Sequence, residues 1–232
     1  VCIITREGAS NRKNGIVILD VKNPYDVKIL SEYNNDLTGG VHNIFIYKNH
    51  VFAVNNSRKF DIIDISDPVN PYHVSSFELK TPGHSIHDVW VVDGIAYSSN
   101  WKQGVYLVDI GKGIAGGSPS NPVQIGNYRY DSGGNHAAFP FLSKSTGKFY
   151  VIGGDEIFPW GIGALKDEPS NPRGGYHFLN FSDPENPVEE AIYQVPEAGS
   201  HNMWIVGDTL ITGNYQGGLR IVDISGELLG DI

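Results

Sequence analysis

An apolar run that closes on an acidic or amide residue recurs along this chain of 232 residues. In its clearest copy, residues 60–71 read FDIIDISDPVNP, so that the run ends at Asp64 and a proline turn follows. We call the closing positions the anchors; they are Asp20, Asp64, Asp109, Asn180 and Asp223. Their spacing is roughly 44 residues, with one longer gap, and such a period is typical of repeat architectures.

Two further residue types keep a constant distance from three of the anchors. One is a histidine that precedes the anchor, at His42, His87 and His201. The other is an asparagine between the histidine and the anchor, at Asn55, Asn100 and Asn214. Because two residue types keep the same offsets in three copies, the repeat extends well beyond the apolar run.

Each copy contains four short runs rich in Val, Ile, Phe and Tyr, separated by turns that contain Gly, Asn, Asp or Pro. Such runs are typical of β-strands. Four antiparallel strands in about 44 residues make one blade of a β-propeller. The alternative of paired helices is disfavoured, because 28 Gly and 13 Pro leave no uninterrupted stretch for them.

The first strand of a copy is apolar on both faces, as residues 44–47 (IFIY) show. A blade that packs between two other blades needs this pattern, whereas a sheet with one solvated face would alternate apolar and polar residues. We therefore predict an all-β fold, a β-propeller of four-stranded antiparallel blades, of which the chain covers an open arc of a larger ring.

The chain resembles the LVIVD-repeat proteins, a family of bacterial and archaeal propellers. The resemblance depends on segments such as 104–109 (GVYLVD) and 63–71 (IDISDPVNP). It implies a protein that is secreted, periplasmic or attached to the cell surface. It implies no particular reaction.

The repeat predicts a single domain over residues 1–232. Its parts are a partial blade at 1–34, blades at 38–79, 83–128 and 134–195, the last with an inserted loop, and a three-stranded partial blade at 199–232. We expect the remaining blades of the same protein at both chain ends.

Charge and composition narrow the range of partners. The formal net charge is −9 and the basic residues form no stripe, so we expect no nucleic acid partner. No stretch of eighteen apolar residues occurs, so we expect no membrane span in this segment. Cys2 is the one cysteine, which excludes an internal disulfide.

Topology predicts where the polar residues of the repeat gather. The start of the first strand and the end of the second lie at the same rim of a blade, because the two strands are antiparallel neighbours. We expect the following residues at one channel mouth: His42, His87, His136, His201, Asn55, Asn100, Asn214, Asp155, Glu156, Arg6 and Glu7.

Three interpretations of the histidines remain open. In the first, each histidine and the residue after it (Asn43, Asp88 or Asn202) make structural hydrogen bonds. In the second, imidazoles hold a transition metal such as Fe, Cu or Zn, with Asp155 or Glu156 completing the set. In the third, a sugar or peptide binds among histidines, asparagines and the aromatic side chains of Trp101, Trp160 and Tyr215.

A glycine-rich segment at 111–118 (GKGIAGGS) invites comparison with a phosphate-binding loop. It lacks the Gly-Lys-Ser/Thr ending and a following helix, so we predict a flexible hairpin tip.

The function that these patterns favour is an exported or cell-surface binding or scaffold module. We expect a protein, small-molecule or carbohydrate ligand at the mouth lined by His and Asn. The alternative is a metal-dependent oxidoreductase or lyase that uses the ring of histidines.

Overall fold

The computed structural model describes residues 1–8, 13–131, 134–157, 174–195, 198–215 and 217–232. Within these residues every regular element is a β-strand, which confirms the all-β prediction. The chain forms two compact units, one of residues 1–96 with 108–124 and one of residues 97–107 with 125–232.

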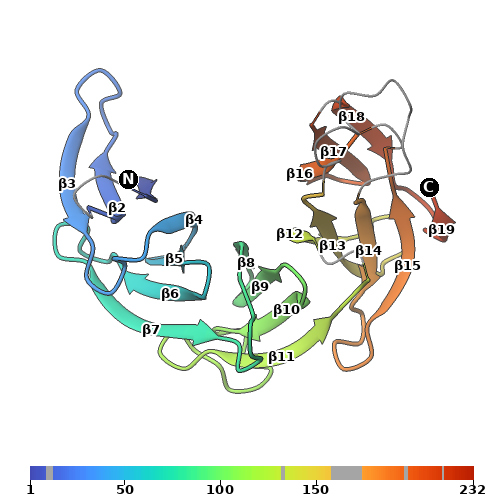
Figure 1. Ribbon diagram of the computed structural model, residues 1–232, viewed down its shortest axis with the longest axis horizontal. Helices are drawn as coiled ribbons and strands as arrows, with labels where there is room; N and C mark the ends of the chain where they lie inside the picture. The colour runs from blue at the N-terminus through green and yellow to red at the C-terminus, as the bar shows by residue number, and fades with distance from the viewer. Residues whose placement is uncertain (9–12, 132–133, 158–173, 196–197, 216) are drawn as a thin grey trace. The chain divides into compact units, whose positions relative to one another are not determined.

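The first unit contains two complete sheets (Figure 1). Strands β1 (Cys2–Arg6), β2 (Gly15–Asp20) and β3 (Lys28–Tyr33) form a three-stranded sheet in chain order. Strands β4 (Val41–Tyr47), β5 (His50–Asn55), β6 (Lys59–Asp64) and β7 (Tyr72–Glu78) form a four-stranded antiparallel sheet, also in chain order.

A third sheet has the order β11-β10-β9-β8, and its residues are divided between the two units. Its strands are β8 (Asp88–Val92), β9 (Ile95–Asn100), β10 (Gly104–Asp109) and β11 (Val123–Tyr128).

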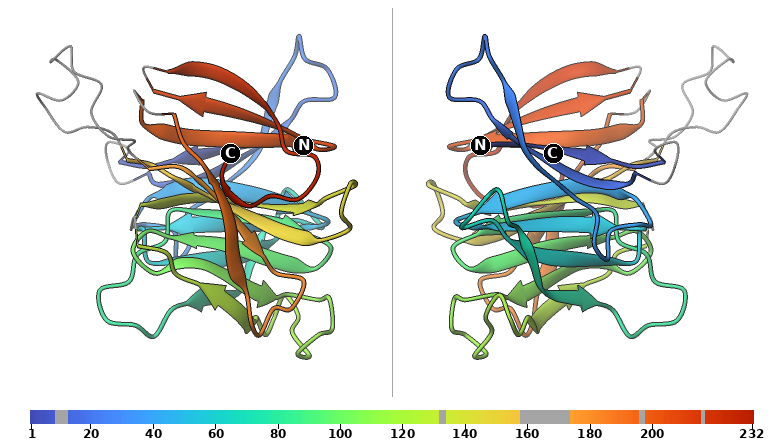
Figure 2. Two further views of the ribbon diagram at one scale, coloured as in Figure 1. Left: turned by 90° about the vertical axis from the view of Figure 1, so that its right-hand side faces the viewer. Right: turned by 90° about the vertical axis from the view of Figure 1, so that its left-hand side faces the viewer.

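The second unit contains the last two sheets, which Figure 2 shows from two sides. Strands β12 (Asn135–Leu142), β13 (Phe149–Asp155), β14 (Tyr176–Asn180) and β15 (Val188–Tyr193) are antiparallel neighbours. Strands β16 (Ser200–Val206), β17 (Thr209–Asn214) and β18 (Gly218–Asp223) form a three-stranded antiparallel sheet.

A short strand near the end of the chain was not anticipated from the sequence. Strand β19 (Gly230–Asp231) pairs in parallel with β15 and makes its sheet five-stranded. The Ile232 N–H donates to the Ile192 carbonyl at 3.0 Å. Two residues with no alternation of apolar and polar side chains carry no strand signal, which is why the sequence did not reveal this pairing.

The anchors owe their recurrence to the turns that follow their strands. In all five, the side-chain Oδ1 accepts the N–H of the residue two positions later, at 2.7 to 3.0 Å; the donors are Lys22, Ser66, Gly111, Ser182 and Ser225. Asn180 serves as well as the four aspartates because its amide oxygen accepts the same bond. Such a side chain ends a strand and starts a turn.

Asp109 extends this anchor bond into a ring of donors. Its Oδ1 accepts the N–H groups of Gly111, Lys112 and Gly113, and its Oδ2 accepts those of Ala115 and Gly117. Gly117 lies so close to the Asp109 carbonyl that a Cβ would sit 2.1 Å from the oxygen. The N–H groups that could have cradled a phosphate therefore bind this carboxylate.

Neighbouring sheets pack face to face within each unit. In the first unit, Ile16 and Ile18 of β2 share a core with Val51 and Ile63, and Phe52 and Ile62 share another with residues of β8. In the second unit, Ile152 and Phe178 pack with residues of β16 and β17. Consecutive sheets are thereby held with their first strands as neighbours, β4 beside β8 and β12 beside β16.

We expect Asp109→Ala to lower the free energy of unfolding by about 3 kcal/mol, because it removes a buried, charged acceptor that serves five backbone N–H groups. Desolvation alone would raise the pKa of Asp109, but the bonds from these N–H groups outweigh it and hold the pKa well below its usual value. The stabilisation should therefore be present at neutral pH and be lost as the pH falls below about 4.

Urea unfolding from pH 2.5 to pH 7 measures this effect. The control is Asp20→Ala, whose carboxylate accepts the Lys22 N–H in the same unit, with an expected loss of about 1 kcal/mol. Equal losses in the two variants would show that the five donors do not act as described.

Candidate functional site

A β-bulge marks the histidine position of the first strand. The pairing with the second strand shifts between Val41 and Ile44 in β4, between Asn135 and Ala137 in β12, and between Ser200 and Met203 in β16. His42, His136 and His201 lie inside these three bulges. Since a bulge changes the direction in which its residues point, it lets the imidazole leave the regular alternation of the sheet.

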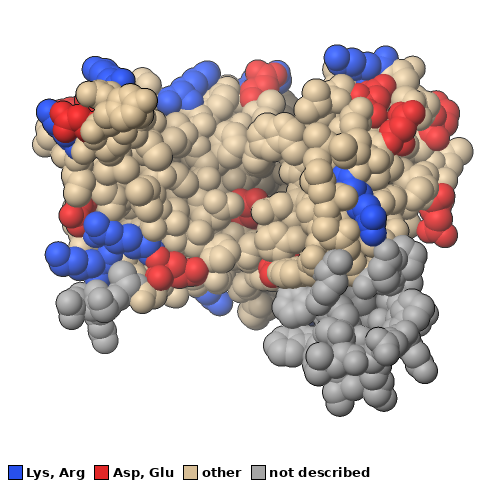
Figure 3. Space-filling model, turned by 90° about the horizontal axis from the view of Figure 1, so that it is seen from above, with Lys and Arg blue, Asp and Glu red and all other residues tan. Residues whose placement is uncertain are grey.

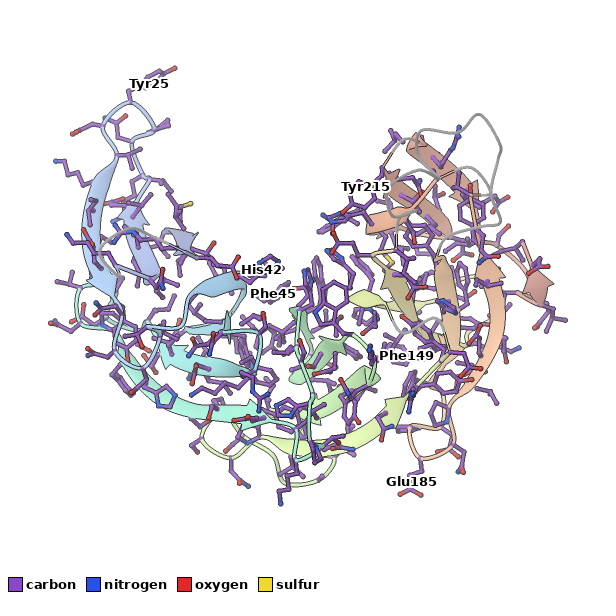
Figure 4. All side chains as sticks on the ribbon, in the orientation of Figure 1. Tyr25, His42, Phe45, Phe149, Glu185 and Tyr215 are labelled. Carbon is purple, nitrogen blue, oxygen red and sulfur yellow. The ribbon has the colours of Figure 1, made fainter. Side chains whose placement is uncertain are left out.

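In the first unit, the imidazoles of His42 and His87 meet. Their ring centroids lie 4.4 Å apart with an interplanar angle of 61°. His42 Nδ1 lies 2.7 Å from Glu7 Oε2, so a residue from the end of β1 reaches this pair. Figure 4 labels His42 and, further along β4, Phe45.

The residues after these two histidines tie consecutive sheets together. The Asn43 amide donates to Asp88 Oδ1, and the Val89 N–H donates to the same oxygen. This is the structural interpretation of the repeated pair, observed for Asn43 and Asp88. Burial raises the pKa of Asp88 to about 6, against the opposing effects of the Val89 N–H, the Asn43 amide and His42.

In the second unit, His136 and His201 meet in the same way, with ring centroids 4.1 Å apart. A carboxylate lies against both: Glu156 Oε2 is 3.7 Å from His136 Nε2, and Glu156 Oε1 is 3.7 Å from His201 Nε2. Tyr215 donates its hydroxyl to Glu156 Oε1, and its ring meets the His201 ring edge-on at 5.2 Å. We call these four residues the Glu156 cluster.

The Glu156 cluster is partly open to solvent. His136 is buried, whereas the side chain of His201 is 33% exposed, that of Glu156 is 20% exposed and Tyr215 is 43% exposed. Desolvation and the hydrogen bond to Glu156 raise the pKa of Tyr215 to about 12, so its hydroxyl keeps its proton at neutral pH. The carboxylate of Glu156, the imidazole of His201 and the phenol of Tyr215 are the groups of the cluster that an incoming molecule can reach.

Asp155 does not join Glu156. Its side chain is fully buried, and Oδ2 lies 3.1 Å from His177 Nε2. The other ring nitrogen of His177 lies 3.0 Å from Glu189 Oε1, and the ring stacks on Tyr130 at 3.8 Å. Adjacent residues of a strand point to opposite faces, so the acidic pair divides between a buried network and the open cluster.

Burial alone would lower the pKa of His177, but the hydrogen bonds to Asp155 and Glu189 outweigh it and raise the pKa to about 9. His177 is therefore a buried imidazolium between two carboxylates. It falls outside the repeated offsets, so sequence reasoning did not identify it.

The asparagines of the repeat are buried and make structural hydrogen bonds, some of them to a neighbouring segment or sheet. Asn55 donates to the Asp36 carbonyl and to Asp61 Oδ2. Asn100 donates to the Ser98 carbonyl and hydroxyl. Asn214 donates to Thr212 Oγ1 and accepts the Tyr176 hydroxyl.

Arg6 of the expected mouth and the two tryptophans of the sugar or peptide interpretation remain to be placed. The Arg6 guanidinium pairs with Glu32 of β3 at 2.6 Å, away from the Glu7–His42 contact. The Trp101 backbone pairs with Asn135 at the start of β12. Trp160 lies outside the described residues.

A second regularity of the first strands was missed at the level of sequence. The third residue after each histidine is aromatic, at Phe45, Trp90, Phe139 and Trp204. The rings of Phe45 and Trp90 lie 4.7 Å apart, and those of Phe139 and Trp204 lie 5.4 Å apart. This constant offset is visible in the sequence and would have indicated that consecutive first strands are neighbours.

Charge is dispersed over the face of the molecule that Figure 3 shows. Lys and Arg alternate with Asp and Glu there, and the described residues of this face form no continuous basic patch. The described part of the chain contains no helix that is long and apolar enough to cross a membrane.

Comparison with known families identifies the repeat. The family profile of the LVIVD repeat matches residues 38–78 and residues 83–130. A search of curated protein sequences finds no match.

Solved structures of low sequence identity share the fold. The β-propeller domain of Cps50 (Swd1) from Myceliophteria thermophila has a TM-score of 0.58 at 12% identity, with 92% of this chain and 64% of that chain covered. The WD40 domain of SCAP from fission yeast has a TM-score of 0.53 at 12% identity, with coverages of 99% and 54%. The designed protein Ika4 has a TM-score of 0.51 at 11% identity, with coverages of 80% and 91%.

This chain thus spans less than two thirds of the length of the two natural propeller structures. At these identities the likeness concerns the fold alone. Together with the four-stranded antiparallel sheets, it confirms the predicted β-propeller fold.

We expect Asp88→Asn to stabilise the protein at pH 7 by about 1 to 2 kcal/mol, because it removes a carboxylate whose ionised form is disfavoured by burial. With the pKa raised from 3.8 to about 6, the folded state binds this proton more tightly than the unfolded state. The free energy of unfolding of the wild type should then fall as the pH rises from about 4 to about 6.

Urea unfolding of the wild type and the variant across this interval checks the prediction. Asp26→Asn is the control, since Asp26 is exposed in the same unit and loses the same charge. A wild-type profile that the Asp88 substitution leaves unchanged would contradict it.

We expect Asp155→Asn to cost about 3 kcal/mol of stability, because it leaves the buried His177 with one carboxylate in place of two. The pKa of His177 should fall from about 9 toward its usual value. The stabilisation from His177 is full below about pH 6.5 and is lost as the pH rises through about 9, so the loss caused by the substitution should be largest near pH 6 and shrink toward pH 9.

Urea unfolding and NMR titration of the His177 ring measure both effects. Asp231→Asn, an exposed substitution in the same unit, is the control. An unchanged His177 titration would refute the pairing.

Proposed function

We infer that this chain, which carries LVIVD repeats in β-propeller blades, is a binding module whose ligand contacts the Glu156 cluster. The observation that supports this proposal is the convergence of His136, His201 and Tyr215 on a single carboxylate that solvent can reach. Stability of the fold does not require His201, Glu156 and Tyr215 to be partly exposed, so their exposure favours a role in binding.

The chemistry of the cluster fits a small ligand that bears hydroxyl groups, such as a carbohydrate. A carboxylate accepts hydrogen bonds from hydroxyls, and an imidazole can either donate or accept. The exposed ring of Tyr215, set edge-on against His201, offers an apolar face to the C–H groups of a sugar. The carboxylate of Glu156, the imidazole of His201 and the ring of Tyr215 lie close together, which suits a site for a sugar ring.

The location of the protein is also part of the proposal. The resemblance to LVIVD-repeat proteins, now supported by the two matched repeats, favours a secreted, periplasmic or surface-attached protein. A carbohydrate ligand is consistent with such a location.

A second candidate function is metal binding, with an oxidoreductase or lyase activity built on it. An imidazole nitrogen and a carboxylate oxygen are donor types that Fe, Cu and Zn accept. The distance of 3.7 Å between His136 Nε2 and Glu156 Oε2 is slightly longer than the separation of about 3 to 3.5 Å between ligand atoms that share one such ion. In this unit His136 and Glu156 would hold the ion, and Tyr215 would orient the carboxylate through its hydrogen bond.

We expect Glu156→Gln to weaken ligand binding at least tenfold, because the charge of the accepting group is lost while its shape is kept. A glycan array probed with the purified protein identifies ligands, and calorimetry with a bound glycan measures the dissociation constants. The matched control is Glu185→Gln, which makes the same change in the turn between β14 and β15 (Figure 4).

The same two variants separate the candidates. Zinc, iron and copper are measured by mass spectrometry after each is added in turn and the excess removed by dialysis. Stoichiometric metal that Glu156→Gln alone loses would favour the metal candidate. Glycan binding that Glu156→Gln leaves unchanged, in the absence of bound metal, would refute both.

A further inference from the structure

The glycine-rich connection after β10 forms one wall of a cavity in the first unit. The cavity lies between this connection and the turn that joins β4 to β5, and its volume is about 230 Å³. The residues that shape it include Tyr47, Lys48, His50, Phe52, Ile110 and Pro119. All six belong to the first unit, so the cavity lies within that unit.

The wall is held in a defined shape by contacts of its own. The connection from β10 to β11 spans residues 110–122, whereas that from β6 to β7 spans only residues 65–71. Asp109 accepts N–H groups along the first part of the longer connection, as far as Gly117. The Pro119 carbonyl accepts the Ser75 hydroxyl at 2.6 Å, which ties the second part to β7. A ligand would therefore meet a preorganised wall, which lowers the entropic cost of binding.

The deep part of the lining is apolar. Phe52 and Ile110 are buried members of one core, and Tyr47 packs against the same core. Pro119 is half-buried and adds its apolar ring. Since an apolar cavity of roughly 150 Å³ can hold benzene, this cavity has room for a ring that bears a substituent, or for two fused rings.

An ammonium group lies beside this apolar lining. Lys48 is exposed, and its Nζ lies over the ring of Tyr47, 5.1 Å from the ring centroid. None of the carboxylates in the described part of the chain forms an ion pair with this ammonium. His50 of the lining lies with a carboxylate already, since its Nε2 is 3.6 Å from Asp64 Oδ2. Lys48 is thus a cation that is available to an anionic ligand.

We propose that this cavity binds a small aromatic carboxylate. The ring of the ligand packs against the apolar lining beside Tyr47 and Phe52, and its carboxylate pairs with the ammonium of Lys48. The Glu156 cluster belongs to the other unit, so this site is separate from the one proposed for a carbohydrate. Each of the two proposals can fail without the other.

Titration with indolepropionate, followed by proton–nitrogen correlation NMR of the labelled chain, tests the proposal. Gly94 and Gly111 line the cavity, and their amides report on its occupancy. We expect both signals to shift and saturate with a dissociation constant on the order of 1 mM, as is usual for a ligand of this size. No saturable shift of these amides at about 10 mM indolepropionate would overturn the proposal.

A charge reversal tests the pairing of the carboxylate. Lys48→Glu should weaken the binding of indolepropionate about fivefold, because it replaces an attractive pair with a repulsive one. The same variant should bind tryptamine, which carries an ammonium in place of the carboxylate, more tightly than the wild type does. The control is Lys22→Glu, an exposed lysine in the turn after β2, which should bind both compounds like the wild type. Unchanged affinity of Lys48→Glu for indolepropionate would overturn the proposal.

An aliphatic acid tests the preference for a ring. We expect octanoate to bind about threefold more weakly than indolepropionate, since it cannot stack on the aromatic lining. Tyr47→Leu should reduce this difference, and circular dichroism verifies that the variant keeps its strand content. If octanoate binds the wild type as tightly as indolepropionate, the assignment to an aromatic ligand is wrong, whether or not Tyr47→Leu folds.

Discussion

Burial of both faces of a sheet that lies between two others, such as β4–β7, is the constraint on which the structure depends. Ile62 and Ile63 are neighbours in β6, and both are fully buried. Because consecutive residues of a strand point to opposite sides, they belong to different cores, Ile62 with residues of the following sheet and Ile63 with residues of the preceding one. A slip of the strand by one residue would turn every side chain to the opposite face of the sheet. The pairing register is therefore fixed by the two cores on either side of the sheet.

This register places the histidines. When consecutive sheets pack with their first strands as neighbours, residues at the same repeat position meet, as His42 meets His87 and His136 meets His201. The bulge at the start of the strand frees the imidazole from the sheet. The chemical character of each histidine pair then depends on the side chains at the ends of the surrounding strands. These are Glu7 in the first unit, and Glu156 and Tyr215 in the second.

The sequence predicted the repeat and the strands, because period and offset are properties of the chain alone. It could not separate Asp155 from Glu156, since that division depends on which face of β13 meets His177. The asparagines looked like members of a polar mouth, yet Asn55 and its equivalents are buried and make structural hydrogen bonds. A constant offset shows that a residue is required and leaves open whether folding or binding requires it.

The central claim is that equivalent positions of consecutive blades meet at their first strands. Nuclear Overhauser effects between histidine ring protons, in protein labelled selectively at histidine, test it directly. The account predicts cross-peaks between the rings of His42 and His87 and between those of His136 and His201, whose centroids lie 4.4 Å and 4.1 Å apart. Absence of both cross-peaks in a protein whose strand pairings are intact would contradict it.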